Sequence, residues 1–170
     1  MILFLLASCL DDDLAPDASG EFIAFQTNFA DYRDWKSELV AEDPEGLGHL
    51  SGTRYVYISD MPANGSETFP TGTMIVKEAH NGDDRADWDI FAMVKRGNNY
   101  NSTGAHGWEW FELTWIGDVP AIAWRGPTSP ANSGYTDLDG DTAASGDCNA
   151  CHASAWQNDY VIDAALQLQE

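Results

Sequence analysis

Cys148-Asn149-Ala150-Cys151-His152, close to the C-terminus, is the stretch on which the interpretation of the whole chain depends. Cys-x-x-Cys-His is the attachment signature of c-type haem. Two thiols three positions apart on one helical turn can each form a thioether with a haem vinyl group, and the histidine that follows then ligates the iron. The sequence therefore predicts one covalent haem c, held by Cys148 and Cys151, with His152 as the axial ligand.

Two other interpretations of this motif compete with haem. A structural zinc site needs four nitrogen or sulfur ligands, and the only further cysteine is the distant Cys9. A redox dithiol is typical of a helix that follows a strand near the N-terminus of a βαβ unit, whereas this motif lies near the C-terminus. Both comparisons favour haem.

The N-terminus reads Met1-Ile-Leu-Phe-Leu-Leu-Ala-Ser-Cys9, an apolar run that ends in a cysteine. It resembles the lipobox of bacterial lipoproteins, in which Cys9 would be acylated. The alternative is a truncated ordinary signal peptide, because the basic n-region is missing. The run is too short to span a bilayer. Both interpretations predict export, so we expect a periplasmic or cell-envelope protein attached to the membrane only through a lipid anchor.

Length and charge limit the organisation and the partners of the chain. We expect a signal over residues 1–9, an acidic tether over 10–20 and a single haem c domain over 21–170. The formal net charge is −20. A chain this acidic lacks the basic face that phosphate binding needs, so we expect no nucleic-acid partner. The charge either maintains solubility or steers a basic redox partner towards the protein.

Hydrophobic patterning predicts a sheet between two helices. Apolar residues three and four apart predict a helix over residues 21–40. Runs of β-branched and aromatic residues predict strands over 53–59, 72–78, 87–96, 108–115 and 119–124. Pro120 places the last strand at an edge. The haem motif is expected to open a terminal helix that continues through Leu166. The expected fold class is α+β: a predominantly antiparallel β-sheet with an N-terminal helix and a C-terminal haem-bearing helix.

Several pieces of sequence occur in an order and spacing that match a known family. They are Trp35, Thr53-Arg54-Tyr55-Val56-Tyr57, residues 69–78, residues 93–100, residues 107–111, the haem motif and Asp159-Tyr160-Val161. Over residues 20–165 the chain resembles the cytochrome P-460 family and its close relative, cytochrome c′-beta. The resemblance implies a mostly antiparallel β fold, one haem c with a vacant sixth site, and a homodimer.

The resemblance also implies a chemistry. In cytochrome P-460 a lysine is bonded to a haem meso carbon, and the matching residue is Lys77. Family members oxidise hydroxylamine, and some bind or convert nitric oxide, whereas the c′-beta relatives lack the cross-link and look like gas-binding proteins. From the residues alone, Lys77 ends an apolar strand and could instead emerge into solvent. Arg54 is expected to donate to a haem propionate or a polar ligand, the alternative being an exposed strand residue.

Family members that act on hydroxylamine carry an acid shortly before the haem motif, where it can accept substrate protons. The matching position here is Ala143, so the base is absent unless Asp139 or Asp141 replaces it. We take Asp141 as the candidate. The segment from Asp137 to Asp141 also has a faint likeness to a calcium loop, but it lacks the glycine and the glutamate that such loops use.

A sixth protein ligand on the iron would change the function. The available side chains are Met61, Met74, Met93, His49, His80 and His106. Met74 and Met93 fit core positions better, and the three histidines are expected in solvated loops. Three functions stay open: oxidation of hydroxylamine or conversion of nitrogen oxides at a five-coordinate haem, binding of nitric oxide or carbon monoxide without turnover, and electron transfer. We favour the first, with Lys77, Arg54 and Asp141 around the open site and a redox protein as the electron acceptor.

Overall fold

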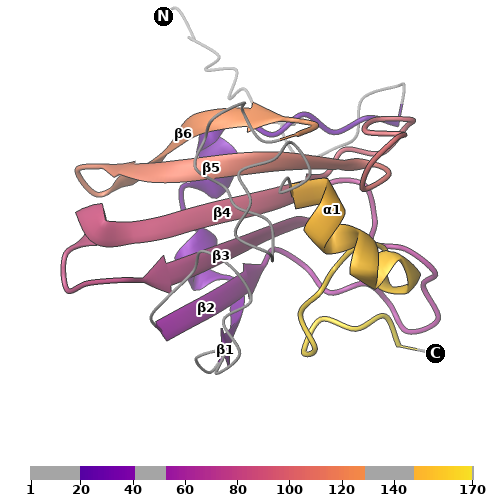
Figure 1. Ribbon diagram of the computed structural model, residues 1–170, viewed down its shortest axis with the longest axis horizontal. Helices are drawn as coiled ribbons and strands as arrows, with labels where there is room; N and C mark the ends of the chain where they lie inside the picture. Colours follow the sequence, from indigo (N-terminus) through magenta and orange to yellow (C-terminus); the bar gives the residue numbers. More distant parts are fainter. Residues whose placement is uncertain (1–19, 41–52, 129–147, 170) are drawn as a thin grey trace, which may run out of the picture.

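A six-stranded antiparallel sheet forms the body of the protein. The computed structural model describes residues 20–40, 53–128 and 148–169. The strands are β1 Lys36–Val40, β2 Thr53–Ile58, β3 Met74–His80, β4 Trp88–Lys95, β5 Trp108–Ile116 and β6 Val119–Gly126. They lie in the order β1-β2-β3-β4-β5-β6, so each strand pairs with its neighbours in sequence (Figure 1). This arrangement is a β-meander, which confirms the predominantly antiparallel fold.

All five predicted strands are present, as β2 to β6. β6 lies at one edge of the sheet, where Pro120 pairs with Trp115 on its inner side. The prediction from Pro120 is therefore confirmed, because a proline has no N–H to offer to a further strand.

The helix predicted over residues 21–40 is wrong. This segment forms two short 3-10 helices, η1 Gln26–Phe29 and η2 Tyr32–Asp34, and then continues into the edge strand β1. Phe29 and Tyr32 are fully buried, whereas Phe25 is 63% exposed and Leu39 is 64% exposed. The helical spacing of apolar residues therefore marked a few isolated buried positions at tight turns, and not one continuous helical face.

The C-terminal helix is present but shorter than expected. α1 spans Cys148–His152, and a 3-10 helix, η4, follows over Ala153–Asn158. The helical segment ends at Asp159, whose φ is +49°. The helix therefore stops well before Leu166.

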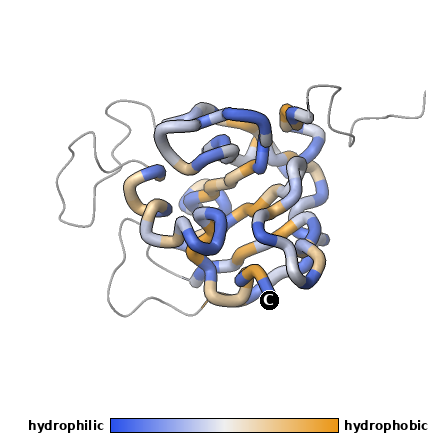
Figure 2. The backbone as a smooth tube through the Cα atoms, turned by 90° about the vertical axis from the view of Figure 1, so that its right-hand side faces the viewer, coloured by the Kyte–Doolittle hydropathy of each residue, from blue (hydrophilic) through white to orange (hydrophobic). Residues whose placement is uncertain are grey.

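Both faces of the sheet are covered. The N-terminal segment covers one face, where the buried cluster includes Phe22, Phe29, Tyr32, Val76 and Phe111. The C-terminal segment covers the other, where the cluster includes Val56, Ile75, Met93, Trp108, Trp110, Val161 and Leu166. Adjacent residues of a strand point to opposite faces, so Ile75 and Val76 belong to different clusters. Hydrophobic stretches are concentrated in the central strands, with hydrophilic stretches in the surrounding loops (Figure 2).

Figure 1 shows α1 against one face of the sheet, beside β4 and β5. We call this side the haem-motif face. No helix among the described residues has the length and apolar character that a membrane crossing requires.

Candidate haem site

The two cysteines of the motif lie on α1. Cys148 is half-buried against the cluster of the haem-motif face, and Cys151 is exposed. Residues three apart on a helix share one face. Both thiols are thus placed to reach one prosthetic group on the haem-motif face.

His152 is held in the form that binds a metal. Its Nδ1 lies 2.6 Å from the carbonyl oxygen of Tyr160, and its ring centroid lies 4.6 Å from that of Trp110. Because a carbonyl only accepts, Nδ1 carries the proton and Nε2 keeps its lone pair for iron. Burial lowers the pKa of His152 to about 4, against the opposing effect of the Tyr160 hydrogen bond and with a smaller lowering from Lys77. The imidazole is therefore neutral at pH 7.

Lys77 lies in the middle of β3 and does not emerge from its end. It pairs with Val56 on β2 and Phe91 on β4. The side chain is half-buried. Burial lowers the pKa of Lys77, and the charge of Arg54 lowers it further, whereas Cys151 and Cys148 act in the opposite direction. An amine with a lowered pKa loses its proton more readily, and only the uncharged amine is a nucleophile.

Arg54 is buried, at 8% exposed, so it is not an exposed strand residue. It pairs with Ala79 across β2 and β3, two positions from the pair of Val56 with Lys77. Residues directly opposite each other on antiparallel strands point to the same face, as do residues two apart. Arg54 and Lys77 therefore share the haem-motif face with the cysteines and His152.

The described residues of this face fit a haem c. Two thiols stand one helical turn apart, a neutral histidine carries a lone pair at Nε2, and two cations lie on the strands beside them. An apolar wall of Val56, Ile75, Met93 and Trp110 adjoins them. This set provides a ligand for the iron, two thiols for covalent attachment, and basic side chains that can pair with the propionate groups of a haem.

Asn149 makes a set of contacts beside the haem motif that sequence reasoning missed. Its Oδ1 accepts hydrogen bonds from Asn101 Nδ2 at 2.7 Å, Ala105 N at 3.0 Å and Trp110 Nε1 at 2.9 Å. Its Nδ2 donates to the carbonyl of Pro127 at 2.9 Å. These bonds connect α1 to the loop between β4 and β5, to β5 itself and to the residue that follows β6. The motif leaves its second position unspecified, so no local signal pointed to Asn149.

The candidate sixth ligands are distributed over both faces. Met74 and Met93 are both buried in core clusters, as expected, and Met74 belongs to the opposite face. His80 is not solvated as predicted: its Nε2 lies 2.8 Å from Glu78, and its ring stacks on Trp88 at 3.6 Å between centroids. His106 is exposed.

Several candidate residues lie outside the described ranges, namely Cys9, His49, Asp139, Asp141 and Ala143. The lipidation of Cys9 and the base role of Asp141 stay predictions. Within the described ranges, no three His, Cys, Asp or Glu side chains gather to hold a metal ion.

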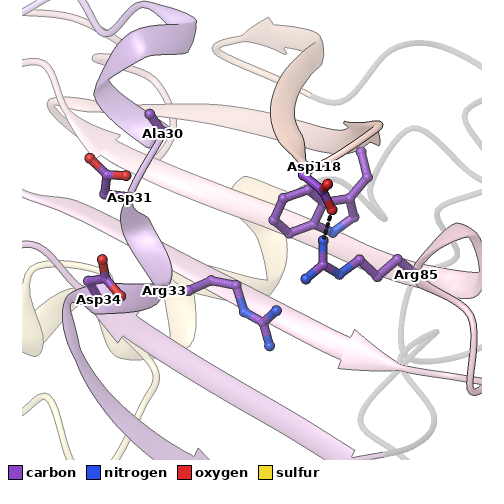
Figure 3. A pocket seen from close by; sticks show the side chains of 7 residues that line it. Ala30, Asp31, Arg33, Asp34, Arg85 and Asp118 are labelled. Atoms are coloured by element: carbon purple, nitrogen blue, oxygen red, sulfur yellow. Dashed lines mark hydrogen bonds and ion pairs between the residues drawn. The ribbon is translucent and has the colours of Figure 1, made fainter.

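A surface pocket lies on the opposite side of the sheet (Figure 3), lined by Ala30, Asp31, Arg33, Asp34, Arg85, Trp115 and Asp118. Its cations already face acids, with Arg85 NH1 3.1 Å from Asp118 and Arg33 Nε 3.4 Å from Glu78. This pocket is separate from the haem motif.

Comparison with known proteins gives one match. A protein-family model described as Cytochrome P460 matches residues 29–163. This range includes Arg54, Lys77 and the whole haem motif. A search of curated proteins and a search of solved structures found no match.

Proposed function

The chain belongs to the cytochrome P460 family, and from this premise we propose that it is an extracytoplasmic mono-haem c protein that oxidises hydroxylamine or converts nitrogen oxides. The family implies a haem cofactor. When bound, a haem with one open axial position supplies an iron centre that binds a small nitrogen compound and exchanges electrons with it.

One observation carries the proposal: a neutral His152, with Nδ1 engaged by Tyr160 and Nε2 available, lies on the same sheet face as Lys77 and Arg54. In the proposed site Cys148 and Cys151 hold the cofactor, and His152 is the axial ligand. Met74 and His80 belong to the other face, so neither is placed to ligate the iron. Met93 and Met61 pack on the haem-motif face, and an open sixth position is proposed on the ground that Met93 is buried as core filler, at 5% exposed.

The other residues act on the macrocycle and on the ligand. Lys77 is proposed as the residue bonded to a haem meso carbon, where the new bond would replace one amine hydrogen and the meso hydrogen and pass two electrons to an oxidant such as peroxide. Its lowered pKa supports this role because only the uncharged amine has a lone pair to form the bond. Arg54 is proposed to donate to a propionate or to the bound ligand. Asp141 is proposed to accept the protons that hydroxylamine loses on oxidation.

The setting of the protein is part of the same proposal. A lipid at Cys9 anchors it in the cell envelope, two copies form a homodimer, and electrons leave to a redox protein. The formal charge of −20 supports a basic acceptor, because opposite charges speed the encounter of the two proteins.

A second candidate function is capture of nitric oxide or carbon monoxide without turnover. It is favoured by Ala143, which occupies the position where hydroxylamine-oxidising relatives carry an acid. Such a protein has an ordinary haem c and no bond to Lys77.

The test begins with the exported protein, its intact mass and its ferrous absorption spectrum. We expect the mass of the chain plus one haem, and a Soret band red-shifted from that of ordinary c-type haem. Lys77→Arg keeps the charge but cannot form the same bond, so its spectrum should return to the ordinary c type. Turnover of hydroxylamine with an artificial acceptor should be present in the parent and lost in K77R.

Two results decide against parts of the proposal. A parent protein with an ordinary spectrum and tight nitric oxide binding but no turnover would establish the second function. A parent protein without covalent haem would remove both functions.

A further inference from the structure

We propose that the buried ion pair between Lys95 and Asp159 positions the axial histidine, by holding the turn whose Tyr160 carbonyl accepts the hydrogen bond from His152. Lys95 and Asp159 are then positioning residues that adjust how strongly the imidazole donates electrons to iron. This inference rests on the proposed function, because it requires a haem on His152.

The ion pair is enclosed and fully partnered. Lys95 Nζ lies 2.7 Å from Asp159 Oδ1, and each residue is 7% exposed. Lys95 Nζ also donates to the carbonyl of His106 at 3.0 Å and lies 5.0 Å from the centre of the Trp108 ring. The other carboxylate oxygen of Asp159 accepts from Phe69 N at 2.9 Å. Because little water reaches this pair, it fixes where Asp159 lies relative to β4.

The turn that this pair holds has an unfavourable backbone conformation. Asp159 has φ +49° and Tyr160 has φ +68°. Residues other than glycine rarely adopt positive φ, and a conformation of this kind persists where surrounding contacts impose it. The contacts are present: Trp108 Nε1 donates to the Asp159 carbonyl at 2.7 Å, and Tyr160 N donates to Ala155 O at 2.8 Å.

The turn ends on the carbonyl that faces His152. Tyr160 O accepts from His152 Nδ1 at 2.6 Å. Since Asp159 and Tyr160 are consecutive, a rotation at either residue moves this oxygen away from Nδ1. A hydrogen bond at the outer nitrogen makes a metal-bound imidazole a stronger donor. Weakening it should weaken the bond from iron to histidine and favour the ferrous state.

The competing explanation is that the pair only stabilises the fold, and the chain offers a matched control for it. Glu109 on β5 is also a buried carboxylate, at 2% exposed. It accepts from Arg125 at 2.6 and 2.8 Å and from Arg96 Nη1 at 3.4 Å. Arg125 in turn donates to the carbonyl of Ala24 in the N-terminal segment. Arg96 also pairs with Glu21 of the same segment. Glu109→Gln therefore removes a buried carboxylate from a partly buried charge cluster whose contacts do not include Asp159, Tyr160 or His152.

The experiment compares the haem-loaded parent with Asp159→Asn, Lys95→Met, Lys95→Arg and Glu109→Gln. Asparagine tolerates positive φ, so D159N removes the charge and not the preference for the turn. The readouts are the stretching frequency of the bond from ferrous iron to histidine, by resonance Raman spectroscopy, and the reduction potential. K95M removes the same ion pair from its β4 side. Either D159N or K95M is therefore sufficient to test the inference if the other variant does not fold.

We expect D159N and K95M to lower the stretching frequency and to move the reduction potential to more positive values. K95R should stay close to the parent, and E109Q should lose thermal stability while keeping both parental values. Parental frequencies and potentials in D159N or K95M would overturn the inference, as would an equal shift in E109Q. A parent without covalent haem would contradict the proposed function itself, so the two failures are distinguishable.

Discussion

At the scale of single residues, Asn149, at an unspecified position of the haem motif, bonds the motif to the rest of the protein. Asn149 is half-buried, and its Oδ1 accepts hydrogen bonds from Asn101, Ala105 and Trp110. A buried donor that loses its acceptor lowers stability, because on folding it gave up a hydrogen bond to water and now has none in its place. Asn149 thus connects the attachment segment to the sheet.

Asn149→Ala should lower the free energy of unfolding by roughly 1–3 kcal/mol, because it leaves the Trp110 indole N–H and the Ala105 N–H without their acceptor. It should also reduce the fraction of exported protein that carries covalent haem. Denaturant unfolding and intact mass measure the two effects. Ser154→Ala is the control, since Ser154 is exposed and donates only to the Cys151 carbonyl. Equal behaviour of N149A and S154A would show that the Asn149 contacts contribute little.

At the scale of elements, the loop between β4 and β5 carries Asn101 and Ala105, two of the partners of Asn149. The conformation of this loop depends on a glycine at its start. Gly97 follows β4 with φ +77°, and a Cβ there would collide with Thr71 Oγ1 and lie 2.8 Å from the Gly20 carbonyl oxygen. Gly107, at the other end of the loop, accepts from Arg96 N at 2.7 Å. The end of β4 therefore lies close to two other segments, and only a residue without a side chain fits.

Gly97→Ala should destabilise the protein more than Gly65→Ala. Gly65 has a similar φ of +81°, but nothing lies within 4 Å of the point that a Cβ would occupy there. Both substitutions carry the cost of left-handed backbone, about 1–2 kcal/mol. G97A adds the cost of displacing Thr71 and the Gly20 carbonyl, roughly 1–3 kcal/mol. Chemical denaturation of the two variants gives the difference, and equal losses would contradict the close approach at Gly97.

At the scale of the whole molecule, the sheet separates two chemically different sides. Lys77 faces the haem motif, and its neighbour Glu78 faces the N-terminal segment. Glu78 is fully buried. It accepts from the hydroxyl of Tyr32 and, at 3.3 Å, from that of Tyr57, and it lies 2.8 Å from His80. The face under the N-terminal segment thus encloses a hydrogen-bonded network around the Glu78 carboxylate. The unfolded chain lacks this network, so the stability of the fold depends on pH.

The protein should lose stability as the pH rises above about 10. Burial and the neighbouring Glu78 raise the pKa of Tyr32 far above its ordinary value of 10.0, and burial also raises that of Tyr57. In this range the unfolded chain releases phenol protons that the folded chain retains, so alkali favours unfolding. Below this range the contribution is fully present.

Tyr32→Phe isolates this effect. At neutral pH it should cost roughly 1–3 kcal/mol, because Glu78 loses a donor. The difference in unfolding free energy between parent and Y32F should become smaller above pH 10. Y32F should still lose some stability in this range, because the pKa of Tyr57 is also raised. Phe29→Leu, a buried substitution without a titrating group, should keep the parental pH dependence. A constant gap between parent and Y32F up to pH 12 would contradict the raised pKa of Tyr32.

Local patterns in the chain were sufficient for much of the fold and for the attachment motif. The five strands from β2 to β6 follow from runs of β-branched and aromatic residues between turn signals, and Pro120 predicts an edge because its backbone lacks a donor. The proposed roles of Cys148, Cys151 and His152 come from their spacing in the Cys-x-x-Cys-His motif. Each of these inferences needs only neighbours in sequence.

The remaining features depend on contacts between distant parts of the chain. The spacing in residues 21–40 predicted a helix, but the burial of Phe29 and Tyr32 against the sheet is met by 3-10 turns and an edge strand. Strand register places Arg54 and Lys77 on the face of the haem motif. Lys95 meets Asp159 across 64 positions of sequence, and Asn101 meets Asn149 across 48. No local propensity encodes such pairs, because their energy comes from burial and hydrogen bonds that exist only once the sheet has formed and the C-terminal segment has packed on it.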